Sequence, residues 1–171
     1  MIMEMSVNSK NRMEGKTARQ PYRLFKHEKP AMALGLAVNH LMSKPAFARL
    51  AFGEWSRILV GQINRGHYYF VVDDKNQIQG FAGWGLTSRD KAEAWLNGSR
   101  PLSYEDCLEG DHCVCNVWSA NTNQVHRWMT REARRIWTEG KLKTIYFKRY
   151  YADGRVRATC FSVNQLGAEA K

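Results

Sequence analysis

The sequence has few of the features that mark secreted, membrane-spanning or disordered chains. It contains four cysteines and four prolines in 171 residues. No apolar run approaches the roughly 18 to 20 residues that a membrane-spanning helix needs. The charged N-terminal region also shows no pattern of a secretory signal. We therefore expect a cytoplasmic protein without a membrane span, whose cysteines are free thiols in a reducing compartment.

The composition is that of a folded domain. Hydrophobic residues make up 44% of the chain and aromatic residues 12%, which is enough for an ordinary core at this length. The polar, basic stretch 1–30 predicts a flexible leader. We expect residues 31–165 to form a single domain and residues 166–171 to form a short tail.

Positive charge dominates the chain and is unevenly distributed. The net charge is +10, and residues 121–157 carry ten Lys or Arg against three acidic residues. A basic region on a nearly neutral body predicts an acidic partner there: nucleic acid, an anionic lipid surface or an acidic carrier protein. The alternative is a charged face that serves only solubility.

Hydrophobic periodicity predicts a mixed series of helices and strands. We expect helices over 31–42, 43–63, 88–98 and 123–140, and strands in a hairpin at 67–88, at 111–120 and in a second hairpin at 143–163. Ser43, Ser88 and either Asn121 or Thr122 are the expected helix caps, and Gly53 predicts a break. This order resembles the α+β fold of N-acetyltransferases, in which the central strand separates from its neighbour and an acyl-pantetheine arm lies in the gap.

The stretch GDHCVCNVWSAN at 110–121 could be a metal site, a redox pair or a strand that lines a cleft. Zinc needs four well-placed ligands, and the sequence has no second CxxC or HxxxH cluster, so we expect no metal. A redox pair needs the C-x-x-C spacing at the start of a helix. Cys113 and Cys115 are therefore best interpreted as small apolar residues on one face of a strand.

The same stretch resembles the G-D-x-x-x-x-x-D-W-x-A motif of the RTX-toxin-activating lysine acyltransferases, the hemolysin-activating family. The positions that match in register are Gly110, Asp111, Trp118 and Ala120. The strand GFAGWGLTS, with Gly83 and Trp84, resembles the family's hairpin strand that carries a small residue before a tryptophan. The segments LG, SKP and GQINRGHY precede it at the expected separations, so the resemblance covers roughly residues 34–137.

The resemblance implies an N-acetyltransferase-like fold, with a mixed, mostly antiparallel sheet flanked by helices. It also implies a transferase without metal or bound cofactor, which moves a fatty acyl chain from the phosphopantetheine thioester of acyl carrier protein to internal lysines of an RTX-type protoxin before export. Because acyl carrier protein is strongly acidic, the basic region would have a partner. The residues that we expect to contact the carrier or the thioester are Arg127, Arg131, Arg134, Arg135, Lys148, Arg149, Trp84, Trp118 and Ser119. The sequence is compatible with a monomer and with a homodimer.

The chain departs from the family at the catalytic positions. By the resemblance, the family's catalytic histidine and aspartate correspond to Phe47 and Val117, and neither of these transfers a proton. His40 and His67 are the histidines closest in sequence to the expected cleft. Asn116 can orient a group and donate a hydrogen bond, although an amide is not a base. The candidate catalytic residues are therefore His67, His40 and Asn116, and a purely structural role for each histidine is the alternative.

Strand alternation predicts on which face of the sheet these side chains lie. It places Asn116, Trp118 and Ala120 together, with Cys113, Cys115 and Val117 opposite. An aromatic wall of Trp55, Trp84 and Trp118 could also lower the pKa of a buried lysine without any base.

Three classes of function follow. The first is an active lysine acyltransferase of a divergent branch. The second is a catalytically inactive relative that binds the carrier or the toxin. The third is a nucleic-acid-binding protein, which the basic and aromatic stretch YFKRYY at 146–151 suggests, although no RNP-like or helix-turn-helix pattern supports it.

Overall fold

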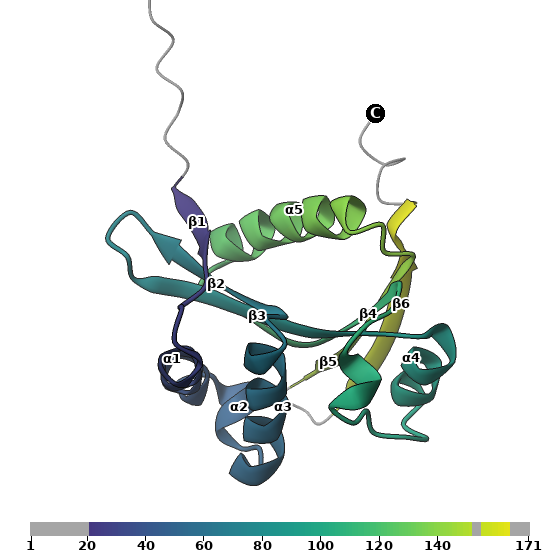
Figure 1. The fold of residues 1–171 in the computed structure, drawn as a ribbon. Coiled ribbons are helices and arrows are strands. Elements are labelled where there is room, and N and C mark those ends of the chain that lie inside the picture. The colour runs from purple at the N-terminus through teal and green to yellow at the C-terminus, as the bar shows by residue number, and fades with distance from the viewer. Residues whose placement is uncertain (1–20, 152–154, 165–171) are drawn as a thin grey trace, which may run out of the picture.

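The computed structural model describes residues 21–151 and 155–164, which are built around a six-stranded sheet (Figure 1). The strands follow the order of the chain, β1-β2-β3-β4-β5-β6. Every neighbouring pair is antiparallel except β4 and β5, which run parallel. Because parallel neighbours need a long crossover, the chain passes through helix α5 between these two strands.

The elements have the following bounds. The strands are β1 (Tyr22–Phe25), β2 (Tyr68–Asp73), β3 (Ile78–Thr87), β4 (His112–Ala120), β5 (Thr144–Tyr150) and β6 (Val156–Ser162). The helices are α1 (Pro30–Met42), α2 (Pro45–Ala48), α3 (Phe52–Asn64), α4 (Arg89–Leu96) and α5 (Asn123–Glu139), with a short 3-10 turn, η1 (Glu105–Cys107).

Helices cover both faces of the sheet (Figure 1). Helices α1 to α4 lie on one face, and α5 crosses the other. On the first face, Leu41 of α1 and Leu59 of α3 are fully buried in a cluster with Phe70 and Phe81. On the second face, Met129 and its neighbours on α5 pack against the sheet. The central strands are therefore buried on both sides, as their nearly continuous apolar character predicts.

The predicted elements are present, with differences at their ends. The break that Gly53 predicts falls before it, because α3 begins at Phe52. Ser43 ends α1, and Lys44 takes the N-cap position before Pro45. Thr122 caps α5, and its hydroxyl accepts a hydrogen bond from the Val125 N–H at 3.2 Å.

The leader predicted over 1–30 is wrong for residues 22–25, which pair with β2 as an edge strand. Residues 1–20 and the predicted tail 166–171 lie outside the described residues. The α+β class, with a mixed and mostly antiparallel sheet flanked by helices, is confirmed. Among the described residues, no helix combines the length and the apolar character that crossing a membrane requires.

Candidate functional site

Strands β4 and β5 pair over only part of their length. The parallel ladder joins His112–Cys115 to Thr144–Phe147. Beyond Cys115, β4 continues to Ala120 and stays paired with β3. Within the described part of the chain, residues 116–120 thus have no strand partner on their β5 side. The predicted separation of the central strand from its neighbour is present, and it leaves peptide N–H and C=O groups available to a ligand.

A β-bulge sits at the start of this separated segment. Gly83 of β3 is opposite Val117, whereas the next residue, Trp84, is opposite Cys115, so Asn116 is the extra residue on β4. A bulge reverses the side-chain alternation after it, and bulges are frequent beside active sites. The bulge therefore determines which β4 side chains face each layer of helices.

The alternation predicted for β4 is wrong because of this bulge. Trp118 and Ala120 pack toward α5, on the same face as Cys113 and Cys115. Val117 belongs to the cluster under α1 and α3. Asn116 lies on that face too, because its side chain contacts α3. The unpaired segment thus presents Asn116, Val117 and Ser119 to one layer of helices, and Trp118 and Ala120 to the other.

Gln62 of α3 holds Asn116 in this position. Its side-chain N–H donates a hydrogen bond to Asn116 Oδ1, and Gln62 is fully buried. Gly83 makes room for it, since a Cβ at Gly83 would overlap the Gln62 carboxamide. Gln62 Oε1 has no hydrogen-bond partner among the described residues. Sequence analysis did not select Gln62. The signal was a single polar residue in the apolar run LVGQI.

His40 of α1 meets the other end of the segment. Its Nε2 lies 3.2 Å from Ser119 Oγ, and both residues are buried. Burial, assisted by the nearby Lys44 ammonium, lowers the pKa of His40 from 6.5 to about 4. The imidazole is therefore neutral near pH 7, and one of the two groups donates a hydrogen bond to the other. Two of the predicted site residues are thus brought together, as an imidazole–hydroxyl pair.

His67 lies elsewhere. Its ring stacks on Trp84, with the ring centroids 6.1 Å apart. Trp84 packs toward α5, so His67 and His40 are on opposite faces of the sheet. Burial first, and then the Arg65 and Lys26 charges, lower the pKa of His67 to about 4. Its Nδ1 is buried and lacks a hydrogen-bond partner among the described residues.

The expected aromatic wall is divided between the two faces. Trp55 belongs to the cluster under α1 and α3. Trp84 and Trp118 line a groove between the sheet and α5. No lysine can therefore be surrounded by all three indoles on one side of the sheet.

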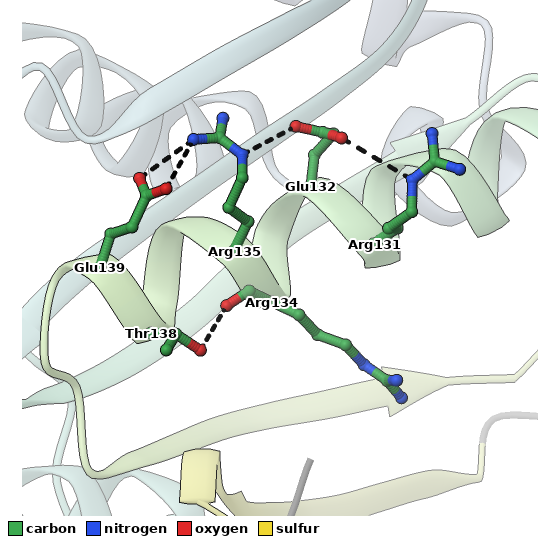
Figure 2. A network of polar contacts seen from close by, with 6 residues as sticks. All are labelled: Arg131, Glu132, Arg134, Arg135, Thr138 and Glu139. Atoms are coloured by element: carbon green, nitrogen blue, oxygen red, sulfur yellow. Dashed lines mark hydrogen bonds and ion pairs between the residues drawn. The ribbon is translucent and has the colours of Figure 1, made fainter. Parts of the chain in front are cut away.

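The predicted cationic group is also divided. The α5 arginines 127, 131, 134 and 135 are exposed. Arg135 is held within the helix, because it pairs with Glu132 at 3.2 Å and with Glu139 at 2.9 Å (Figure 2). The Arg134 side chain points away from these carboxylates, and its carbonyl accepts a hydrogen bond from the Thr138 hydroxyl (Figure 2). Lys148 lies 4.6 Å from the centre of the Trp95 ring of α4, on the opposite face of the sheet, whereas Arg149 contacts Tyr151.

The aromatic residues of the YFKRYY stretch are largely used in packing. Tyr146 is buried against α4, and Phe147 packs on Phe161. Tyr150 is exposed, and Tyr151 lies between Arg149 and Arg155. Only the end of this stretch is therefore open to a ligand.

The cysteines of the opening motif are apolar packing residues. Cys113 and Cys115 share the face toward α5, and both are free thiols. Burial raises the pKa of Cys115 to about 12, and it also raises the pKa of Cys113 well above its ordinary value. Among the described residues, no group of three or more His, Cys, Asp or Glu is placed to hold a metal ion.

The two buried histidines predict how stability depends on pH. Because their folded-state pKa values are lowered from 6.5 to about 4, the unfolded chain binds protons in this range and the folded chain does not. The free energy of unfolding should therefore rise with pH between about 4 and 6.5 and then level off. The Asp106 carboxyl, whose pKa is lowered to about 2, changes the free energy of unfolding only at pH values below this range. Urea denaturation across the range measures the slope, and an unchanged slope in a His40→Gln/His67→Gln variant would contradict the assignment.

Comparison with known proteins places the fold. No family model and no curated protein matches the chain. A GNAT-family acetyltransferase from Listeria monocytogenes 4b F2365 is 12% identical, with 86% of this chain and 84% of that chain covered and a TM-score of 0.50. The loading GNATL domain of CurA from Lyngbya majuscula is 9% identical over 75% of this chain, with a TM-score of 0.47, and the match spans 65% of that domain. The PaiA N-acetyltransferase from Thermoplasma acidophilum, in complex with coenzyme A, is 9% identical over 77% of this chain and 80% of that chain, with a TM-score of 0.47.

Identities this low show the fold and not the activity. None of these structures points to the RTX-toxin-activating family, so that resemblance depends on the sequence motifs alone. The Listeria structure is matched over most of both chains. The chain has the fold of the GNAT acetyltransferases.

Proposed function

We propose that the chain is a protein-lysine acyltransferase, with acyl carrier protein as the acyl donor and an RTX-type protoxin as the acceptor. One observation carries the proposal: β4 leaves β5 beyond Cys115, and the separated segment ends at the His40–Ser119 pair. The gap offers peptide N–H groups for a thioester oxygen, and the pair offers a proton acceptor. The GNAT fold and the motif around Trp118 support the same chemistry.

The reaction replaces a thioester with an amide. The lysine nitrogen bonds to the thioester carbonyl carbon, and the carbon–sulfur bond breaks. In the proposed mechanism, peptide N–H groups of the separated β4 segment stabilise the oxyanion. His40, neutral near pH 7, accepts a proton from the attacking amine beside the Ser119 hydroxyl. His40 releases this first proton to solvent, and the second proton of the amine passes to the sulfur as the intermediate collapses, so that the donor leaves as a thiol.

The test is transfer from a purified donor to a purified acceptor. The chain is mixed with acyl carrier protein loaded with acyl groups of several lengths, and with a protoxin fragment. Intact-mass spectrometry should show the acceptor heavier by one acyl group, on a lysine. An unchanged acceptor mass with every chain length, and with the matching coenzyme A thioesters, contradicts the proposal.

A second function has one observation in its favour. Phe47 and Val117, which stand at the family's catalytic positions, both pack in the hydrophobic cluster under α1 and α3. Apolar packing here replaces the polar pair that the family resemblance implies, and a relative that only binds the carrier or the toxin fits this replacement. Replacing His40, His67 and Asn116 with alanine, and measuring both acylation and carrier binding, distinguishes the two functions. Loss of acylation with retained carrier binding supports the enzyme, whereas carrier binding by an inactive natural chain supports the binding module.

Reversing charge on the exposed face of α5 should weaken carrier binding. Arg127 and Arg134 are exposed, and no ion pair joins either to another described residue. An Arg127→Glu/Arg134→Glu variant should bind acyl carrier protein roughly tenfold more weakly at low salt, with a smaller difference at high salt. Arg49→Glu/Arg57→Glu makes the same change in net charge on the other side of the molecule and is the matched control. Equal losses in both variants would point to net charge and not to α5.

A further inference from the structure

A groove lies between α5 and the sheet, beside the point where β4 leaves β5. About 460 Å³ of empty space lies along it, part of which is open to solvent. Its lining includes Leu24, Ala82, Cys115 and Trp118 from the sheet, and Ala133 and Ile136 from α5. The groove therefore crosses the sheet from β1 to β4, under the C-terminal half of the helix.

The lining is apolar. The Cys115 thiol is neutral, because burial raises its pKa to about 12. Glu132 is the charged residue among those that line the groove. Its carboxylate forms ion pairs with Arg131 and Arg135 (Figure 2). Hydrocarbon, indole and neutral sulfur thus make up the surface, which suits an alkyl chain and offers little to a sugar or a phosphate.

The groove joins the gap beside β4. Cys115 is the last β4 residue that pairs with β5, and Trp118 belongs to the separated segment, yet both side chains line the groove. A thioester carbonyl that lies in the gap would thus have its chain at the mouth of the groove. The exposed side of the same helix is basic, so an acidic carrier could dock outside while the chain lies inside.

We propose that this groove binds the alkyl chain of the acyl group, and that Ala133 and Ile136 set the length it accepts. The inference rests on the proposed function, and it assigns the chain a medium- or long-chain acyl group in place of acetyl. The small Ala133 side chain leaves the space open, and Ile136 lines it further along α5.

The test measures binding without transfer. The first probe is S-dodecanoyl-pantetheine with a terminal bromine, which is detected by quenching of tryptophan fluorescence because Trp84, Trp118 and Trp137 line the groove. The second is S-acetyl-pantetheine, whose affinity is measured by displacement of the brominated probe. The natural chain should bind the dodecanoyl probe at least about tenfold more tightly, because several methylene groups leave water. Equal affinity for the two probes would overturn the proposal.

Two variants locate the binding. Ala133→Leu should remove most of the preference for dodecanoyl, while Thr138→Leu on the exposed side of α5 should keep it. Ile136→Ala should raise the affinity for the hexadecanoyl probe relative to the dodecanoyl probe. If Ala133→Leu folds poorly, this variant alone tests whether the chain binds in the groove. A dodecanoyl preference that survives Ala133→Leu, together with no gain for hexadecanoyl in Ile136→Ala, would overturn the proposal.

The transfer assay separates this inference from the proposed function. Chain-dependent binding in the groove, with an acceptor that is never acylated, supports the groove and contradicts the transferase. Transfer of acetyl and dodecanoyl groups at equal rates supports the transferase and overturns the groove.

Discussion

Replacing His40 with alanine is expected to lower the rate of lysine acylation about 100- to 10,000-fold, the range that a positioned general base contributes. The imidazole lies 3.2 Å from Ser119 Oγ, at the end of the β4 segment that has left β5. Burial and the Lys44 charge keep it neutral near pH 7, so its lone pair is available for a proton. Ser119→Ala should cost less, because His40 itself stays in place.

The choice of acceptor amine distinguishes a role of His40 in proton transfer from a purely structural role of the same residue. A lysine side chain, with a reference pKa of about 10.4, must lose a proton before it attacks at neutral pH. With an acceptor amine that is already neutral, the loss caused by His40→Ala should become much smaller. A variant that was merely misfolded would lose activity equally with both acceptors. If His67→Ala causes the larger loss with lysine, then the base is His67, on the α5 face.

The order of elements was predictable because it depends on local patterns. Period-four apolar spacing in α3 and α5, and the two apolar runs around Asp74–Asn76, each lie within one stretch of sequence. The edge strand β1 was not predictable in this way. Its four residues, YRLF, lie in a basic, polar region, and they form a strand by pairing with the open edge of β2.

The candidate site was only partly predictable, because its geometry depends on contacts between distant elements. The bulge at Asn116 needs Gln62 from α3 and the missing side chain of Gly83, and no pattern within β4 contains either. The grouping of Lys148 with Arg149 could have been rejected from sequence, since neighbours on a strand point to opposite faces. The pairing of His40 with Ser119 needed the packing of α1 on β4.

The Gly-Asp pair that begins the motif has a structural explanation. Gly110 has φ +148°, and a Cβ there would overlap the Thr87 carbonyl at the end of β3. The carbonyl of Asp111 accepts a hydrogen bond from the Lys143 N–H at 2.7 Å, and its carboxylate pairs with the Lys143 ammonium. The pair thus fixes the start of β4 between the end of β3 and the start of β5. The separation of β4 and β5 begins from this fixed end.

Gly110→Ala should therefore destabilise the fold by about 3 kcal/mol or more, since it combines backbone strain with a collision against main-chain atoms that cannot move aside. Urea denaturation followed by circular dichroism measures the change in the free energy of unfolding. Gly35→Ala is the matched control, because Gly35 is in the interior of α1 and a Cβ there meets nothing within 4 Å. It should stabilise the protein by about 0.5–1 kcal/mol through the helical preference of alanine. If Gly110→Ala behaves like Gly35→Ala, then β4 does not begin against Thr87, and the gap beside Trp118 would lack its fixed end.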